Sequence, residues 1–247
     1  MPTEPTGRRP LKTREWPFFK NLAAWLARAG VKPNVISAAS IVFGAFAGIA
    51  LALTGRAQDG WVMRTCWLMA AAFIQLRLIA NLLDGMVAVE GRKGGPTGDL
   101  WNEAPDRISD AAIFIGAGYA AGSVPVLGWA AALVAVFVAY VRALGASVGA
   151  GQCFLGPQAK PHRMALMTAL AIAGAILPEF IARTWIEGSP KVGPHMTILT
   201  LRYSESLKVT SLTIVSFVLS LVILGGLITA WRRLAFIADF LRKKSNP

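Results

Sequence analysis

Six apolar stretches, each about 20 residues long, alternate with shorter polar segments along the chain. An apolar helix of about 20 residues spans the hydrocarbon core of a bilayer. The pattern therefore predicts an all-α, polytopic membrane protein with six transmembrane helices. The predicted spans are residues 36–54, 65–84, 104–122, 126–148, 164–182 and 210–231. The composition agrees, because 55% of the 247 residues are apolar and only 15% are charged, which is far from an ordinary soluble domain.

The segment before the first span, residues 16–30, predicts an amphipathic interfacial helix. One side of this helix carries apolar residues, namely Trp16, Phe19, Leu22, Ala23 and Leu26. Such a helix lies on lipid headgroups or packs on the bundle, and the sequence leaves both alternatives open. No cleavable signal peptide is expected, because residues 1–20 are polar and basic. We expect a cytoplasmic segment 1–35, a transmembrane domain 36–231 and a basic cytoplasmic tail 232–247.

Basic residues are concentrated near the two ends of the chain, and they set the expected orientation. There are 25 Lys and Arg against 13 Asp and Glu, a net charge of +12. Because segments rich in Lys and Arg stay on the cytoplasmic side, both termini are predicted to be cytoplasmic, in a cell inner membrane. The outer loop 183–209 carries four basic residues, which weakens this bias without reversing it. The basic residues flank spans, so we expect contacts with anionic membrane lipids and no nucleic acid.

Acidic and amide side chains interrupt the apolar pattern between residues 81 and 110. At about 100° per residue, Asn81 and Asp84 share one face of the second span with Arg77. If the next helix begins at Gly98, one of its faces collects Asp99, Asn102, Glu103, Asp106 and Asp110. A carboxylate costs about 2.5–3.5 kcal/mol at the centre of a spanning helix, so several on one face indicate a metal, protons or a polar substrate.

Two interpretations of this polar cluster remain open. Hard oxygen ligands on two helices near the cytoplasmic interface favour a site for Mg²⁺, Mn²⁺ or Ca²⁺ rather than zinc. The alternative is a set of helix caps and intramembrane salt bridges, for instance Arg77 with Asp84 and Arg107 with a neighbouring carboxylate. Pro105 removes one helical hydrogen bond and favours a helix start near Asn102.

The same residues resemble the signature of the CDP-alcohol phosphotransferase family, D-x2-D-G-x2-A-R-x8-G-x3-D-x3-D. Five of its eight fixed positions match at the right spacing: Asp84, Gly85, Ala88, Gly98 and Asp106. Asn81 and Asn102 replace two signature Asp residues, and Val89 replaces the Arg. Weaker matches at residues 32–40, 140–149 and 159–164 extend the resemblance across most of the chain.

The resemblance implies a six-span enzyme, acting as a homodimer, that uses one or two Mg²⁺ or Mn²⁺ ions. In that family the signature Asp residues hold metal against the diphosphate of a CDP-linked donor, and the last Asp acts as base on the incoming hydroxyl. Carried over residue by residue, the metal ligands are Asn81, Asp84, Asn102 and Asp106. The residues at the nucleotide are Asp84, Gly85, Ala88 and Gly98. The base is Asp106 by family spacing or, if Asp106 is only a ligand, Asp110.

Three further basic residues, Arg142, Lys160 and Arg163, fall near the inner ends of the fourth and fifth predicted spans. Arg offers a fork and Lys a point charge for phosphate oxygens. Together they favour an acceptor that carries its own phosphate, such as inositol phosphate or glycerol phosphate. Ordinary flanking charge is the alternative for Lys160 and Arg163.

The resemblance thus implies a transferase that moves a phosphatidyl group from CDP-diacylglycerol to a polar alcohol or alcohol phosphate and releases CMP, in phospholipid biosynthesis. The two Asn replacements and the lost Arg leave a second hypothesis. This is a catalytically silent relative that binds a nucleotide-lipid or an anionic lipid. A third hypothesis is an ion or solute transporter. It is less favoured, because a transporter would place its polar groups near the membrane midplane, whereas these residues cluster towards the inner face.

Overall fold

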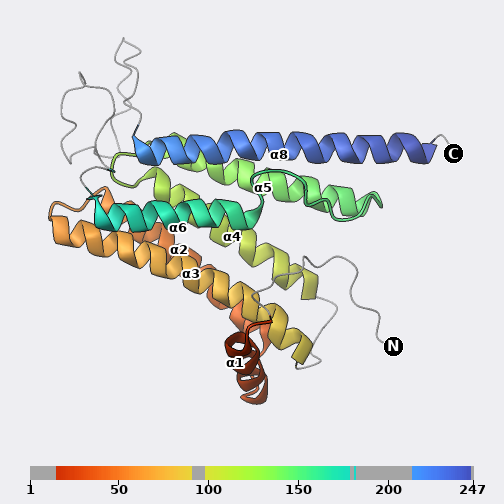
Figure 1. The fold of residues 1–247 in the computed structure, drawn as a ribbon, viewed down its shortest axis with the longest axis horizontal. Coiled ribbons are helices and arrows are strands. Elements are labelled where there is room, and N and C mark those ends of the chain that lie inside the picture. Colours follow the sequence, from red (N-terminus) through yellow and green to blue (C-terminus); the bar gives the residue numbers. More distant parts are fainter. Residues whose placement is uncertain (1–14, 91–97, 179–180, 182–212, 246–247) are drawn as a thin grey trace, which may run out of the picture.

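The computed structural model describes residues 15–90, 98–178, 181 and 213–245, and this part of the chain contains helices, turns and loops but no strand. The helices are α1 (Pro17–Arg28), α2 (Pro33–Thr54), α3 (Gly60–Glu90), α4 (Gly98–Gly118), α5 (Pro125–Ser147), α6 (Lys160–Ile176) and α8 (Ile214–Ser245). The longer helices form a bundle in which α2 contacts α3 and α4, α5 lies between α4 and α8, and α6 packs on α3 (Figure 1). The all-α prediction is confirmed for these residues.

Prolines and polar caps determine where several helices begin. Four helices have a proline at their first or second position: Pro17, Pro33, Pro125 and Pro161. At these positions the missing N–H is one that the helix leaves unpaired in any case. Asp59 caps the N-terminus of α3, since its Oδ1 accepts hydrogen bonds from the N–H groups of Trp61 at 2.7 Å and Val62 at 3.1 Å.

Four helices are long and apolar enough to cross a membrane, namely α2, α3, α5 and α8. The predicted total of six is not confirmed within the described residues. Helix α6 has only 17 residues, and α4 carries Glu103, Asp106, Arg107 and Asp110. Helix α4 is not apolar enough to count as a span, because it contains both the third apolar stretch and half of the polar cluster.

Several helix boundaries differ from the predicted spans. Helix α4 begins at Gly98 and not near Asn102 or residue 104, and Pro105 lies inside it. Helix α6 begins at Lys160 and ends at Ile176, short of residue 182. Helix α8 continues to Ser245, through most of the residues assigned to the basic tail. Hydropathy alone misplaced the starts of α4 and α6 and the end of α8, because polar helical turns continue the backbone hydrogen bonding beyond the apolar stretch.

The N-terminal amphipathic helix is confirmed as α1, and its apolar side packs on the bundle. Ala23 is completely buried, and Phe19, Leu22 and Leu26 belong to the apolar cluster that contains Leu83 and Val87 of α3. Trp16, which was predicted on this side, is 60% exposed. The outward aromatic residues are Trp16, Phe18 and Trp25.

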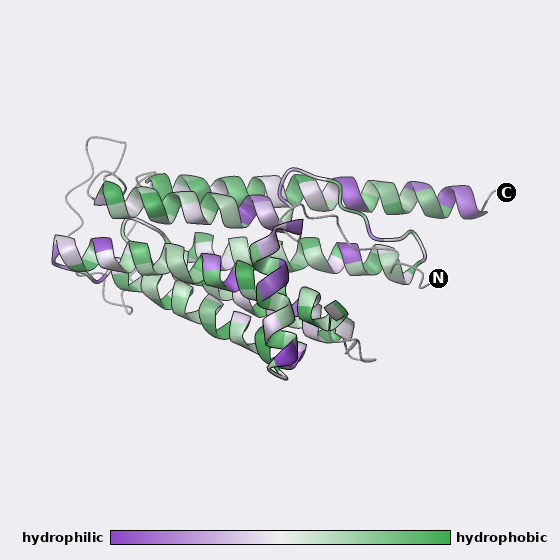
Figure 2. Ribbon diagram, turned by 60° about the horizontal axis from the view of Figure 1, so that its bottom comes forward, coloured by the Kyte–Doolittle hydropathy of each residue, from purple (hydrophilic) through white to green (hydrophobic). Residues whose placement is uncertain are grey.

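The outer faces of the long helices are apolar. On α2 the exposed residues include Val42, Phe46, Ile49 and Leu53. Figure 2 shows α8 coloured as hydrophobic over most of its length and as hydrophilic towards its C-terminal end. Exposed apolar surface on this scale is unusual for a soluble monomer, and it suits helices that face lipid.

Small residues bring α2 and α4 into direct backbone contact. A Cβ atom added at Gly116 would lie 2.1 Å from the carbonyl oxygen of Gly48, and one added at Gly44 would lie 2.6 Å from the Cβ atom of Ser109. The hydroxyl of Ser109 donates a hydrogen bond across this contact to the carbonyl of Ser40, at 3.0 Å. Close packing of this kind holds membrane helices together without large side chains.

Replacing Gly116 by Ala is expected to lower stability by about 1–3 kcal/mol, because the new methyl group collides with backbone that cannot yield as a side chain would. The measurement is thermal unfolding of the purified protein in detergent. Gly60→Ala is the matched control, since no atom lies within 4 Å of a Cβ atom at Gly60. Equal melting temperatures for the two variants would contradict the assigned contact.

Candidate functional site

The polar residues of α3 and α4 come together around one completely buried guanidinium. The NH2 nitrogen of Arg77 donates to Asp106 Oδ1 at 3.0 Å and to Asp110 Oδ1 at 2.6 Å. Asp106 and Asp110 lie one helical turn apart on α4, as their spacing predicts. Arg77 therefore pairs with two carboxylates of the next helix, and not with Asp84 on its own helix.

Lys160, the first residue of α6, brings a third helix to the site. Its Nζ atom donates a hydrogen bond to Asn81 Oδ1 at 2.6 Å and another to Asp106 Oδ2. The ammonium group thus bridges two positions that the sequence assigned to metal ligands. Its side chain is partly exposed, at 22%, whereas the side chain of Asp106 is 9% exposed.

Arg163 lies almost one helical turn after Lys160 and completes the pairing of Asp110. It donates to Asp110 Oδ2 at 3.2 Å and to the carbonyl of Gln158 at 2.9 Å. Both side chains of this ion pair are only 2% exposed. Each oxygen of Asp110 therefore faces an arginine, in a position closed to solvent.

Asp84 differs from the acidic residues of α4. It is 4% exposed, and its Oδ2 accepts a hydrogen bond from the hydroxyl of Ser37 on α2 at 2.8 Å. Its Oδ1 is buried without a hydrogen-bond partner. A buried unpaired acceptor costs about 1–3 kcal/mol, and more when it is charged. Asp84 therefore presents an oxygen that a bound cation or a hydrogen-bond donor would stabilise.

A more open ion-pair group lies nearby on α4. Glu103 accepts hydrogen bonds from Arg107 at 2.5 Å and from Arg142 of α5. The side chains of these two arginines are 21% and 20% exposed, respectively. The guanidinium of Arg142 also lies 5.8 Å from the ring centre of Phe154, a cation–π distance. The predicted salt bridge of Arg107 with a neighbouring carboxylate is confirmed.

The remaining predicted residues are less informative. Gly85 and Ala88 are partly exposed on α3, and Gly98 is exposed at the start of α4 with open space around its Cα atom. The side chains of Asn102 and Asp99 lie outside the described residues. Arg142, Lys160 and Arg163 do not share one open surface, because each is paired with a different carboxylate.

Sequence reasoning missed Ser37 as a member of the site. The serine lies 47 residues before Asp84, and no spacing rule links the two positions. The only available signal was its place in the segment 32–40, which resembles the entry to the first span. The contact requires that α2 and α3 pack against each other, which is a tertiary fact.

The side chains that the structure describes, which do not include those of Asp99 and Asn102, do not fit a site for two divalent cations. Among the described residues, no group of three or more His, Cys, Asp or Glu is arranged to hold a metal ion. Lys160 holds the expected ligand oxygen of Asn81, and Arg77 and Lys160 hold both oxygens of Asp106. Only Asp84 Oδ1 is a buried oxygen without a donor among these groups. One cation beside Asp84 fits this arrangement.

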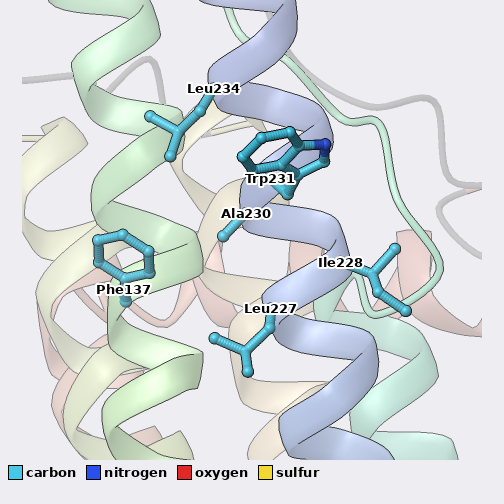
Figure 3. Close-up of a pocket in the computed structure, with 6 residues that line it drawn as sticks. All are labelled: Phe137, Leu227, Ile228, Ala230, Trp231 and Leu234. Carbon is cyan, nitrogen blue, oxygen red and sulfur yellow. The ribbon is translucent and has the colours of Figure 1, made fainter.

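A separate groove of about 440 Å³ lies between α5 and α8 (Figure 3). Its lining is apolar: Phe137, Leu227, Ile228, Ala230, Trp231 and Leu234. Figure 3 shows Phe137 on α5 and Leu227 on α8, with the side chain of Leu227 directed towards α5. Apart from the indole nitrogen of Trp231, these side chains carry no polar atom, so the groove suits a hydrocarbon chain.

Comparison with known proteins gives a structural likeness only. No family model and no curated protein sequence matches this chain. A crystal structure of phosphatidylinositol phosphate synthase from Mycobacterium tuberculosis with CDP-DAG bound matches with a TM-score of 0.62 at 17% identity, covering 89% of this chain and 92% of that chain. The same synthase in complex with manganese and citrate gives 0.62 at 17% identity, covering 89% and 88%. Its apo form gives 0.58 at 18% identity, covering 88% and 94%. At such low sequence identity, these structural matches show a shared fold and no more.

Arg77→Met is expected to destabilise the protein by about 3–5 kcal/mol, because it leaves Asp106 and Asp110 buried with fewer partners. Unfolding in detergent measures the loss. The control is Arg107→Met, which breaks a partly exposed pair within one helix and should cost less than about 1 kcal/mol. A stable Arg77→Met protein would show that the buried pairs do not hold α3 and α4 together.

Proposed function

We propose that this protein, which shares the fold of a phosphatidylinositol phosphate synthase, transfers a phosphatidyl group from CDP-diacylglycerol to a polar alcohol and releases CMP. The observation that carries the proposal is the meeting of Asn81 and Asp84 on α3 with Asp106 on α4, the register in which the chain resembles the CDP-alcohol phosphotransferase signature. We place the enzyme in a cell inner membrane with both termini cytoplasmic, and we propose that it acts as a homodimer.

In the proposed reaction the alcohol oxygen forms a bond to the phosphorus of the phosphatidyl group. The bond from that phosphorus to the oxygen of the departing CMP breaks, and the hydroxyl proton passes to a base. Positive charge near the diphosphate stabilises the negative charge that develops on CMP. Lys160 supplies such a charge from the start of α6. A single Mg²⁺ or Mn²⁺ beside Asp84 would add to it.

Between the two candidate bases we favour Asp106. Asp110 is 1% exposed, and both of its oxygens are fixed by buried arginines. Asp106 is the more accessible of the two, and one of its oxygens faces Lys160, whose side chain is partly exposed. A substrate phosphate that draws Lys160 away would free this oxygen to accept a proton. In this proposal Asp110 and Arg163 serve to fix α4 against α3 and α6.

The acceptor is proposed to carry its own phosphate, and Arg142 is the residue we assign to it. Arg142 is partly exposed, so its guanidinium can exchange Glu103 for a phosphate without burying an unpaired charge. Arg163 is closed to solvent and is not available in the same way. Inositol phosphate and glycerol phosphate remain the candidate acceptors.

A specific observation favours a second candidate, the catalytically silent lipid-binding relative. Every oxygen of Glu103, Asp106 and Asp110 already has an Arg or Lys partner. A site held this way can bind a phosphate through its cations without any free base. Release of CMP from labelled CDP-diacylglycerol by the purified protein, with a panel of alcohols and alcohol phosphates, separates the two candidates. Binding without CMP release under every condition would establish the silent relative.

Asp84→Asn and Asp106→Asn are each expected to reduce CMP release at least about 10²- to 10⁴-fold, the range that a general base alone supplies. Asp84→Asn removes the negative charge of the carboxylate whose Oδ1 is buried without a partner. Asp106→Asn removes the proposed base. Asp239→Asn is the control, because it changes an exposed ion pair with Lys243 on α8. More than half of the activity remaining in both site variants would reject the proposed site.

Arg142→Ala is expected to raise the KM for a phosphorylated alcohol about ten- to a hundredfold, with little change in the KM for CDP-diacylglycerol, because a charge-assisted hydrogen bond is lost. The matched control is Arg107→Ala, which removes the other partner of Glu103 at nearly the same exposure. Steady-state kinetics with each substrate varied in turn provide the measurement. Similar effects of the two variants, or equal effects on donor and acceptor, would argue that Arg142 does not bind the acceptor.

A further inference from the structure

Lys160 occupies a position where the sequence pattern expects a metal ion. Its Nζ atom bridges Asn81 Oδ1 on α3 and Asp106 Oδ2 on α4, which correspond to the first and the last ligand of the signature. An ammonium group satisfies one neutral amide oxygen and one carboxylate. A divalent ion between the same two atoms would have only one negatively charged ligand, the carboxylate of Asp106, and this carboxylate is already paired with Arg77.

The charges of the cluster balance without any bound ion. Three carboxylates, Asp84, Asp106 and Asp110, face three cationic side chains, Arg77, Lys160 and Arg163. These six groups lie together in a buried region where an excess charge of either sign is strongly disfavoured. Each divalent cation would add two positive charges to this set, so a second ion is disfavoured more strongly than a first. The residue at position 81 also fits the internal cation, because an asparagine there avoids a further negative charge.

The backbone around Lys160 is fixed in place before any ligand binds. Gln158, two residues before Lys160, donates its N–H to the hydroxyl of Thr229 on α8 at 3.1 Å, and its carbonyl accepts from Arg163 at 2.9 Å. Ala159 between them is 6% exposed. The start of α6 is thus held against α8 and against its own first turn, which fixes the backbone that carries the Lys160 side chain.

We propose that Lys160 is a built-in cation that replaces one divalent ion between α3 and α4, so that the site binds at most one such ion, beside Asp84. The inference deepens the proposed function and rests on it for the catalytic role of this charge. The chemical class of the remaining ligand is a hard divalent cation such as Mg²⁺ or Mn²⁺, because the unpartnered atom is a carboxylate oxygen.

The test counts the Mn²⁺ ions bound per chain to the purified full-length protein in detergent, by electron paramagnetic resonance of the free ion. The unchanged protein is expected to bind no more than one. Asn81→Asp alone should not raise the number, because Lys160 still bridges the two helices. Asn81→Asp combined with Lys160→Met should bind one more ion than Asn81→Asp alone.

Two controls make the count specific. Asn81→Asp with Lys160→Arg keeps the positive charge and should behave as Asn81→Asp alone. Asn81→Asp with Lys243→Met removes a lysine that pairs with Asp239 on an exposed turn of α8, and it should also leave the number unchanged. Circular dichroism and gel filtration verify that each variant is folded.

Two bound Mn²⁺ ions on the unchanged protein would overturn the inference, whether or not any variant folds. So would an equal number for Asn81→Asp with and without Lys160→Met. The expected counts without CMP release would overturn the proposed function and leave Lys160 as an internal cation. CMP release by an unchanged protein that binds two Mn²⁺ ions would support the proposed function and overturn the assignment of Lys160 as an internal cation.

Discussion

The structure depends on the need of buried charges for partners of opposite sign. Arg77 is completely buried, and it binds Asp106 and Asp110 of the neighbouring helix. In an apolar surrounding neither the guanidinium nor the carboxylates can remain alone, since an unpaired ion there costs several kcal/mol. This requirement fixes the rotation of α4 against α3. The start of α6 follows, because Lys160 and Arg163 pair with the same two carboxylates.

The same pairing decides what the site has to offer a ligand. On α4, both oxygens of each described acidic side chain bind a cation, whereas Asp84 on α3 keeps one buried oxygen free. The arrangement therefore has one position for an external cation and several positive groups for phosphate. The asparagine at position 81 is consistent with this balance, since it provides a ligand for Lys160 without a charge.

The chain shares its fold with proteins to which its sequence has little similarity. The match to the synthase structures covers most of both chains at 17–18% identity. Contacts such as that between Gly48 and Gly116 depend on the absence of a side chain. Lipid-facing positions need only be apolar. Such constraints preserve a bundle while leaving most residues free to differ, so fold and chemistry have to be judged separately.

The sequence by itself determined the helical class, the amphipathic α1 and the alignment of acidic and amide residues on one side of α3 and on one side of α4, because these follow from periodicity along a single helix. It also predicted a salt bridge of Arg107 with a neighbouring carboxylate, and the structure identifies this carboxylate as Glu103 in the same helix. Only the tertiary structure decided the partners of Arg77, the hydrogen bond from Ser37 to Asp84 and the place of Lys160. Each of these joins residues from different helices, and their meeting depends on the packing and rotation of whole helices, which no local pattern encodes.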